Sequence, residues 1–101
     1  MGIIKLFEEF SDVQFEEIAY HDFSFTIRNS EYITFTKKEE VELSKYGTVR
    51  VNINNISINT PQFNINIYKL PDEWYYISVG LRYYYKCDGF EGVKEFLDYI
   101  L

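Results

Sequence analysis

The amino-acid sequence predicts an α+β domain with an antiparallel sheet of about 4–6 strands, covered on one face by helices. Residues 63–87 form three short apolar-rich runs separated by turn signals, which is typical of a strand meander. Residues 89–101 carry apolar side chains at helical spacing. The 101 residues are 47% hydrophobic, which is enough for one core, so we expect residues 1–101 to form a single domain.

The N-terminal third gives mixed signals. Apolar residues at helical spacing predict a short helix in residues 2–10. Residues 13–20 alternate imperfectly and fit either a strand or a further helical turn. Phe23, Phe25 and Ile27 alternate with polar residues, and residues 32–35 read as another strand beyond a turn. Residues 23–35 therefore predict a hairpin.

The middle of the chain contains a capping box. Thr36 precedes Glu39 by three residues, a spacing that satisfies free amides at a helix start, so we expect a helix that continues to Tyr46. Gly47 follows at the position where a left-handed residue often ends a helix. In residues 49–60 the apolar phase changes at Asn54-Asn55, which indicates either a bulge or a tight turn.

The C-terminal part gives the clearest pattern. Strands are expected at 63–70, 73–79 and 82–87, joined by two-residue turns at Pro71-Asp72 and Gly80-Leu81. Asp88 and Glu91 have the spacing of a second capping box, which starts the helix at 89–101. The apolar face of this helix consists of Val93, Phe96, Leu97, Ile100 and Leu101.

Two-residue turns fix the register of the meander, because each turn sets which residues pair. On this register the core face carries Phe63, Ile65, Ile67, Trp74, Tyr76, Tyr83, Tyr85 and Cys87. The opposite face has an aromatic centre within a polar, cationic rim, a composition typical of protein interfaces. The expected partner-binding residues are Tyr68, Tyr75, Ile77, Tyr84, Arg82 and Lys86. The alternatives are an ordinary tyrosine-rich surface, or a face covered by residues 13–35.

Charge and cysteine content restrict the function classes. The net charge of −6 disfavours direct binding to nucleic acid or to an anionic membrane. Cys87 is the only cysteine, so neither an intramolecular disulfide nor a cysteine-rich zinc site is expected, and a reducing cytoplasmic setting is the simplest reading. The first residues do not resemble a signal peptide, and no apolar run approaches the roughly 20 residues that span a bilayer.

Catalytic patterns are weak. His21 and Cys87 could form a base–nucleophile pair, but the predicted register places Cys87 in the core as an inert residue. The acidic residues lack the spacing of a calcium loop, and no phosphate or dinucleotide loop is present. We therefore expect no catalytic residues, no metal and no cofactor.

The sequence thus favours a small intracellular, non-catalytic binding or regulatory module that contacts a protein partner; self-association is compatible with it. The alternative is an acidic inhibitor, such as a viral or phage protein, that occupies a basic nucleic-acid-binding groove of its target. In that case the contact would be made by Glu8, Glu9, Glu16, Glu39, Glu40 and Glu42. A small enzyme or a cation-binding protein is the third class.

Overall fold

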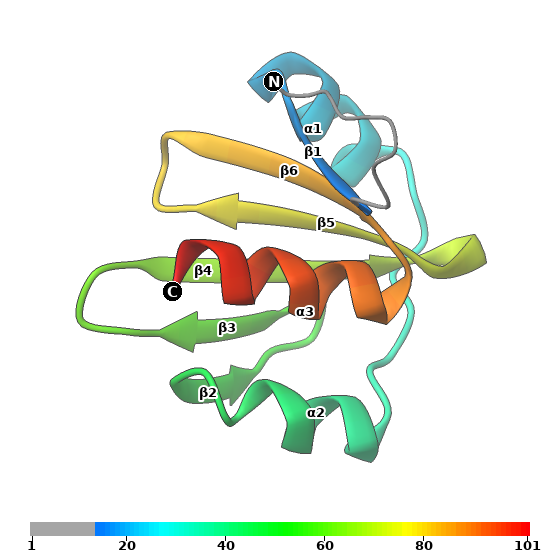
Figure 1. Ribbon diagram of the computed structural model, residues 1–101. Helices are drawn as coiled ribbons and strands as arrows, with labels where there is room; N and C mark the ends of the chain where they lie inside the picture. The colour runs from blue at the N-terminus through cyan, green and yellow to red at the C-terminus, as the bar shows by residue number, and fades with distance from the viewer. Residues whose placement is uncertain (1–13) are drawn as a thin grey trace.

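The structure is a computed structural model, and it describes residues 14–101. The helix expected in residues 2–10 lies outside these residues. One six-stranded antiparallel sheet has the strand order β1-β6-β5-β4-β3-β2 (Figure 1). Its strands are β1 Phe15–Ile18, β2 Thr48–Val51, β3 Ile56–Asn59, β4 Asn64–Leu70, β5 Trp74–Val79 and β6 Tyr83–Asp88. The helices are α1 Tyr20–Arg28, α2 Lys37–Leu43 and α3 Gly89–Ile100. The α+β class, the meander and the C-terminal helix are confirmed.

Helices lie on both sides of this sheet. Figure 1 shows α3 in front of it and α2 beside the β2 edge, and both contribute to the core on this side, which we call the core face. α1 lies on the other side, the second face, where Phe23 contacts the rings of Tyr68, Tyr76 and Tyr84. The buried core between the sheet and the helices α2 and α3 contains Phe35, Leu43, Ile56, Ile58, Ile65, Ile67, Tyr75, Ile77, Val79, Cys87, Val93, Phe96 and Leu97. Residues 14–101 contain no helix that is long and apolar enough to cross a membrane.

The last helix packs as the sequence predicted. Val93, Phe96 and Leu97 are fully buried, because their spacing places them on one side of α3. The ring of Phe96 lies 4.4 Å from that of Tyr85, centroid to centroid. The predicted capping box at the start of this helix is wrong, since the Asp88 side chain makes no cap hydrogen bond.

The predicted register is wrong, because both meander turns have three residues. Leu70 pairs with Trp74 across Pro71–Glu73, and Val79 pairs with Tyr83 across residues 80–82. This register places Ile77 opposite Ile67. Aliphatic side chains therefore meet on the core face. The predicted register would have left Ile77 in solvent and buried Trp74 instead, at a cost in transfer free energy.

The predicted hairpin at 23–35 is also wrong. Residues 20–28 are helical, because Phe23 is buried against three tyrosines of the sheet. The alternation of Phe23, Phe25 and Ile27 with polar residues favoured a strand. In the helix these residues point in different directions, and Phe25 is 58% exposed. Residues 31–36 form no strand and lead from α1 past the end of the sheet to α2, and the Ile33 amide donates to the Lys69 carbonyl (2.8 Å). Tertiary packing has overridden the local pattern.

The middle segment agrees in part. The capping box is confirmed, because the Thr36 hydroxyl accepts from the Glu39 amide and the Glu39 carboxylate accepts from the Thr36 amide. The phase change at Asn54-Asn55 is a tight turn between β2 and β3. Gly47 is not left-handed, which corrects the expectation. A side chain is excluded there for another reason, since a Cβ atom would lie 2.6 Å from the Asn59 carbonyl oxygen.

The packing of α3 gives a stability prediction. Phe96→Ala should lower the free energy of unfolding by about 3–5 kcal/mol, because it leaves a cavity in the core. Chemical denaturation of both proteins measures the change. Tyr99→Ala on the exposed side of the same helix is the control and should cost less than about 1 kcal/mol. Equal costs for the two variants would contradict the described packing of α3.

Candidate functional site

The six predicted partner-binding residues do not share one surface. Tyr75 and Ile77 are buried on the core face. Tyr68 and Tyr84 lie on the second face beneath Phe23 of α1. Arg82 is in the turn before β6, where its guanidinium lies 6.0 Å from the Tyr83 ring. Lys86 lies beside an open hollow next to Trp74, and Tyr68 lines a different one near the β2–β3 turn. Of the alternatives, the one in which residues 13–35 cover the face is met in part, because α1 packs on Tyr68 and Tyr84.

The register creates an ordered set of side chains on the second face across β5, β6 and β1. In the first row, Trp74 lies opposite Asp88, whose amide donates to the Gln14 carbonyl (2.8 Å). In the next row, Lys86 lies between Tyr76 and Glu16. Side chains in neighbouring rows are close enough to interact diagonally. Phe23 of α1 packs on Tyr76 and on Tyr84, one row further along, and thus toward the opposite end of this set.

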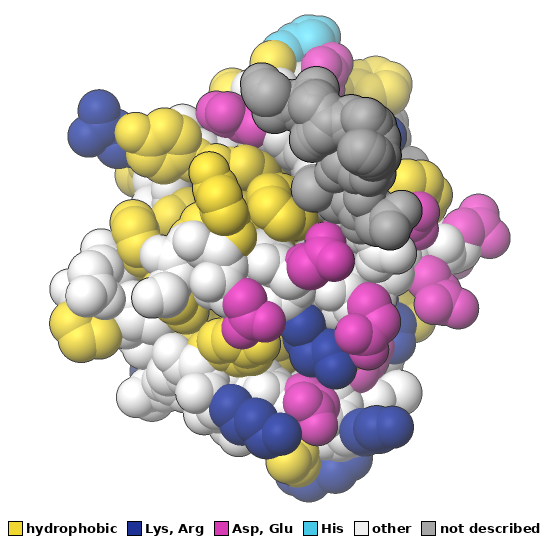
Figure 2. All heavy atoms as spheres, viewed as in Figure 1, with side chains coloured by type: hydrophobic (Ala, Val, Ile, Leu, Met, Phe, Trp, Pro, Cys, Tyr) yellow, Lys and Arg dark blue, Asp and Glu magenta, His cyan; other side chains and the backbone are white. Residues whose placement is uncertain are grey.

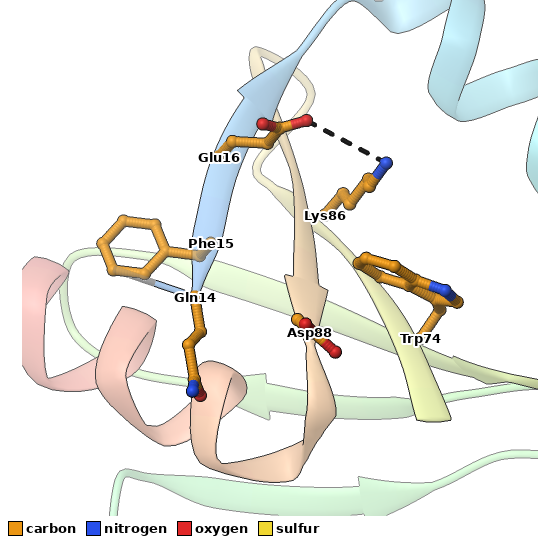
Figure 3. A pocket seen from close by; sticks show the side chains of 6 residues that line it. All are labelled: Gln14, Phe15, Glu16, Trp74, Lys86 and Asp88. Atoms are coloured by element: carbon orange, nitrogen blue, oxygen red, sulfur yellow. Dashed lines mark ion pairs between the residues drawn. The ribbon is translucent and has the colours of Figure 1, made fainter. Parts of the chain in front are cut away.

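The uncovered rows form a hollow of about 250 Å³, which we call the Trp74 hollow (Figure 3). Within it, Lys86 Nζ lies 4.7 Å from the centroid of the Trp74 ring and 4.0 Å from Glu16 Oε2. The Lys86 side chain is 34% exposed, so the ammonium remains accessible to solvent. The hollow is lined by Gln14, Phe15, Glu16, Trp74, Lys86 and Asp88.

Asp88 does not play the helix-capping role that its position predicts. It occupies the N-cap position of α3, where a carboxylate normally accepts a hydrogen bond from the helix start. Its side chain makes no such bond and lines the hollow together with Trp74 (Figure 3). The hollow therefore carries two carboxylates, Asp88 and Glu16, against the single ammonium of Lys86.

Trp74 also borders a second hollow. This neighbouring hollow, of about 360 Å³, lies between the end of α1 and the β4–β5 turn. In that turn Asp72 and Glu73 both have positive φ (63° and 61°), a conformation that ordinary residues rarely adopt. The hollow is lined by Thr26, Asn29, Ser30, Glu31, Leu70, Pro71, Asp72, Trp74 and Tyr76. A half-buried tryptophan between two hollows is well placed to contact a ligand.

A third hollow of about 630 Å³ lies between α1 and the β2–β3 turn, and every residue that lines it is uncharged. Two of its amides, those of Asn52 and Asn55, bond to neighbouring side chains. Asn52 donates to Asn55 (3.1 Å), and Asn55 donates to Asn66 (3.0 Å). Because Ser57 also joins this network, the amides of Asn52 and Asn55 already have partners, and the network stabilises the turn.

Glu39, Lys69 and Tyr75 resemble an acid–base group, but they form a closed cluster. Glu39 accepts from Lys69 (2.8 Å), from the Tyr75 hydroxyl (2.5 Å) and from the Thr36 amide (2.7 Å). Burial by itself would raise the pKa of the Glu39 carboxyl, but these hydrogen bonds outweigh it and hold that pKa below its ordinary value. Burial and the Glu39 carboxylate raise the pKa of Tyr75. The cluster holds α2 on the sheet.

The two residues considered for catalysis, Cys87 and His21, do not come together in the structure. Cys87 is fully buried on the core face, where burial and Glu95 raise the pKa of its thiol to about 12. His21 is exposed in the first turn of α1, on the second face. The two residues therefore lie on opposite faces of the sheet. Among residues 14–101, no group of three or more His, Cys, Asp or Glu side chains is placed to hold a metal ion.

Comparison with known proteins does not indicate a function, so the function has to be inferred from the site. No family model, no curated protein and no solved structure matches the chain. Sequence reasoning found Lys86 but missed Trp74, Glu16 and Asp88 as members of one site. Ser78 was a usable signal. Residues 74, 76 and 78 alternate along one strand and so share a face, and a polar residue among them indicates that this face points away from the core.

The Glu39 cluster predicts a pH-dependent stability. Because the pKa of Glu39 is lower in the folded chain, its ionised form stabilises the fold above the ordinary value of 4.5. This contribution is lost as the pH falls through the lowered pKa. At pH 7, Glu39→Gln should cost about 1.5–3 kcal/mol, and the difference from wild type should narrow below about pH 4. Urea denaturation of both proteins at a series of pH values measures this difference in the free energy of unfolding.

Glu40→Gln is the matched control, because its partner Lys37 is highly exposed and the ion pair contributes little. A cost for Glu39→Gln that is as small as that of the control, or that does not change with pH, would contradict the described cluster.

The position of Cys87 predicts its reactivity. At pH 7.5 a chromogenic disulfide reagent should label Cys87 slowly in the folded protein, because the thiol is both buried and protonated. In denaturant the same residue should react rapidly. Native labelling at the denatured rate would contradict its placement on the core face.

Proposed function

We propose that the protein is a small, non-catalytic binding module that docks on a protein partner through the surface around Trp74. The observation that carries this proposal is the placement of the only tryptophan between two hollows of the second face. Tryptophan removes much water on docking while losing little conformational freedom, so it often dominates the binding energy of an interface.

The surroundings of Trp74 support the same function. The two hollows carry polar and charged groups at their margins, among them Glu16, Lys86 and Glu31. An aromatic centre with a polar margin is the usual arrangement of a protein interface. The Glu39 cluster is closed and Cys87 is buried, so the remaining accessible chemistry of the described residues favours recognition.

Charge mimicry is a second candidate, favoured by one observation on the other side of the sheet. The Tyr46 hydroxyl donates to Asp98 (3.0 Å), and burial, this bond and the nearby Glu42 and Glu91 raise the pKa of Tyr46 to about 12, so its surroundings are acidic. Figure 2 shows acidic side chains over the helices on this side, with basic side chains between them. Glu39 is 12% exposed and bonded within its cluster, so it would not contribute to such mimicry.

A site-specific cross-linking experiment tests the docking proposal. A photoreactive amino acid at Glu31, which is exposed and lines the neighbouring hollow, should capture a defined partner in cells of the source organism. The positional control is the same amino acid at Gln62, in the loop before β4, at the end of β4 away from the neighbouring hollow. It should not capture the partner. Trp74→Ala should abolish capture at position 31.

The captured partner is then purified and its affinity measured. Trp74→Ala should weaken binding at least about 10-fold, whereas Tyr99→Ala, an exposed aromatic on the core-face side, should have little effect. Neutralising Glu42, Glu91 and Asp98 together should also have little effect at low salt. Binding that is insensitive to Trp74 but lost on neutralisation, with a steep salt dependence, would reject Trp74 docking and favour charge mimicry.

A further inference from the structure

We infer that the Trp74 hollow binds an arginine side chain of the partner, and that Lys86 holds this position in the free protein. The inference rests on the proposed function and names the chemical class that the docking surface recognises. Three observations carry it: a cation already on the Trp74 ring, an N-cap carboxylate that makes no cap hydrogen bond, and the charge balance of the hollow.

The first observation is the position of Lys86. Its ammonium lies 4.7 Å from the centroid of the Trp74 ring, within the range of a cation–π interaction. Its ion pair with Glu16 is 4.0 Å long, the Glu16 side chain is 66% exposed, and such pairs contribute little stability. The hollow therefore already accommodates a cation, and this cation is held weakly.

The second observation is the Asp88 carboxylate. Trp74 and Asp88 are directly opposite each other on β5 and β6, and both side chains line the same hollow in Figure 3. A planar cation stacked on Trp74 would find the Asp88 oxygens at its edge. Such a carboxylate would normally cap α3, and here it makes no cap hydrogen bond.

These groups favour arginine over lysine. A guanidinium is flat and weakly hydrated, so it stacks on an aromatic ring while donating two parallel hydrogen bonds to a carboxylate. The lysine ammonium is a compact, strongly hydrated point charge that meets one group at a time. With Glu16 and Asp88 on either side of the cation position, the hollow has a net charge of −1 even with Lys86 present.

The competing explanation is that Lys86 and Trp74 serve only to join β5 and β6. The two explanations make opposite statements about Lys86. A purely structural lysine leaves no cation site when it is replaced. An occupant of the arginine position blocks that site, so its removal should strengthen binding of a cationic probe.

Titration by NMR separates these cases, because the single Trp74 gives a single indole resonance. The probes are acetyl-Gly-Arg-Gly-amide and its citrulline analogue, which has the same shape without the charge. The arginine peptide should move the Trp74 indole and Asp88 amide resonances to saturation, and the citrulline peptide should bind at least about 5-fold more weakly, equivalent to about 1 kcal/mol.

Variants of the isolated chain sharpen this test. Lys86→Gln should bind the arginine peptide about 5-fold more tightly, whereas Lys86→Arg should not, because it keeps a cation on the ring. Asp88→Asn should weaken binding by a similar factor. Glu91→Gln removes the same charge from the first turn of α3, outside the hollow, and is the matched control.

Each outcome is decisive for the arginine site. Equal binding of the arginine and citrulline peptides, an unmoved indole resonance, or no gain in Lys86→Gln would overturn it. If these peptides fail while Trp74→Ala still abolishes capture of the cross-linked partner, then the docking surface stands and only the arginine assignment is lost. If capture does not depend on Trp74, the docking proposal fails whatever the peptides do.

Discussion

The register of the β4–β5–β6 meander is the constraint on which the rest of the structure depends. Two three-residue turns set it, one through the left-handed residues Asp72 and Glu73 and the other through Gly80 at φ 64°. Because side chains alternate along a strand, one residue fewer in either turn would exchange the two faces of the next strand. The observed turns bring Ile65, Ile67, Ile77 and Val79 together on one face. They place Trp74, Tyr76, Tyr84 and Lys86 on the other.

The two faces then differ in what they can bury. The core face is mostly aliphatic, and its deepest tyrosine, Tyr75, is tolerated because its hydroxyl donates to Glu39. The second face has Tyr68, Tyr76 and Tyr84 at the contact with α1, and their hydroxyls favour partial contact with water. α1 covers part of this face, and Phe23 is the only buried residue of α1. The uncovered part is where Trp74, Glu16 and Asp88 meet, which is why the candidate site lies there.

The sequence predicted those elements whose signals are local. The face of α3 follows from apolar spacing, and the start of α2 follows from Thr36 and Glu39, since each involves residues within a few positions. The turn lengths were not predictable from two-residue signals, because a third residue could join either turn. α1 was missed because its helical form depends on Phe23 meeting tyrosines 45 or more positions away. The candidate site depends on the same register, so Lys86 was found without its neighbours.

The most direct test of this account is the pairing of β5 with β6, measured by interstrand backbone nuclear Overhauser effects in the labelled protein. The described register pairs Tyr75 with Cys87 and Lys86 with Tyr76, while Lys86 also pairs with Glu16 of β1. Contacts between these residues are the predicted result. Contacts that instead pair Tyr75 with Lys86 and Trp74 with Cys87 would correspond to a two-residue turn. They would contradict the division of the two faces and, with it, the Trp74 site.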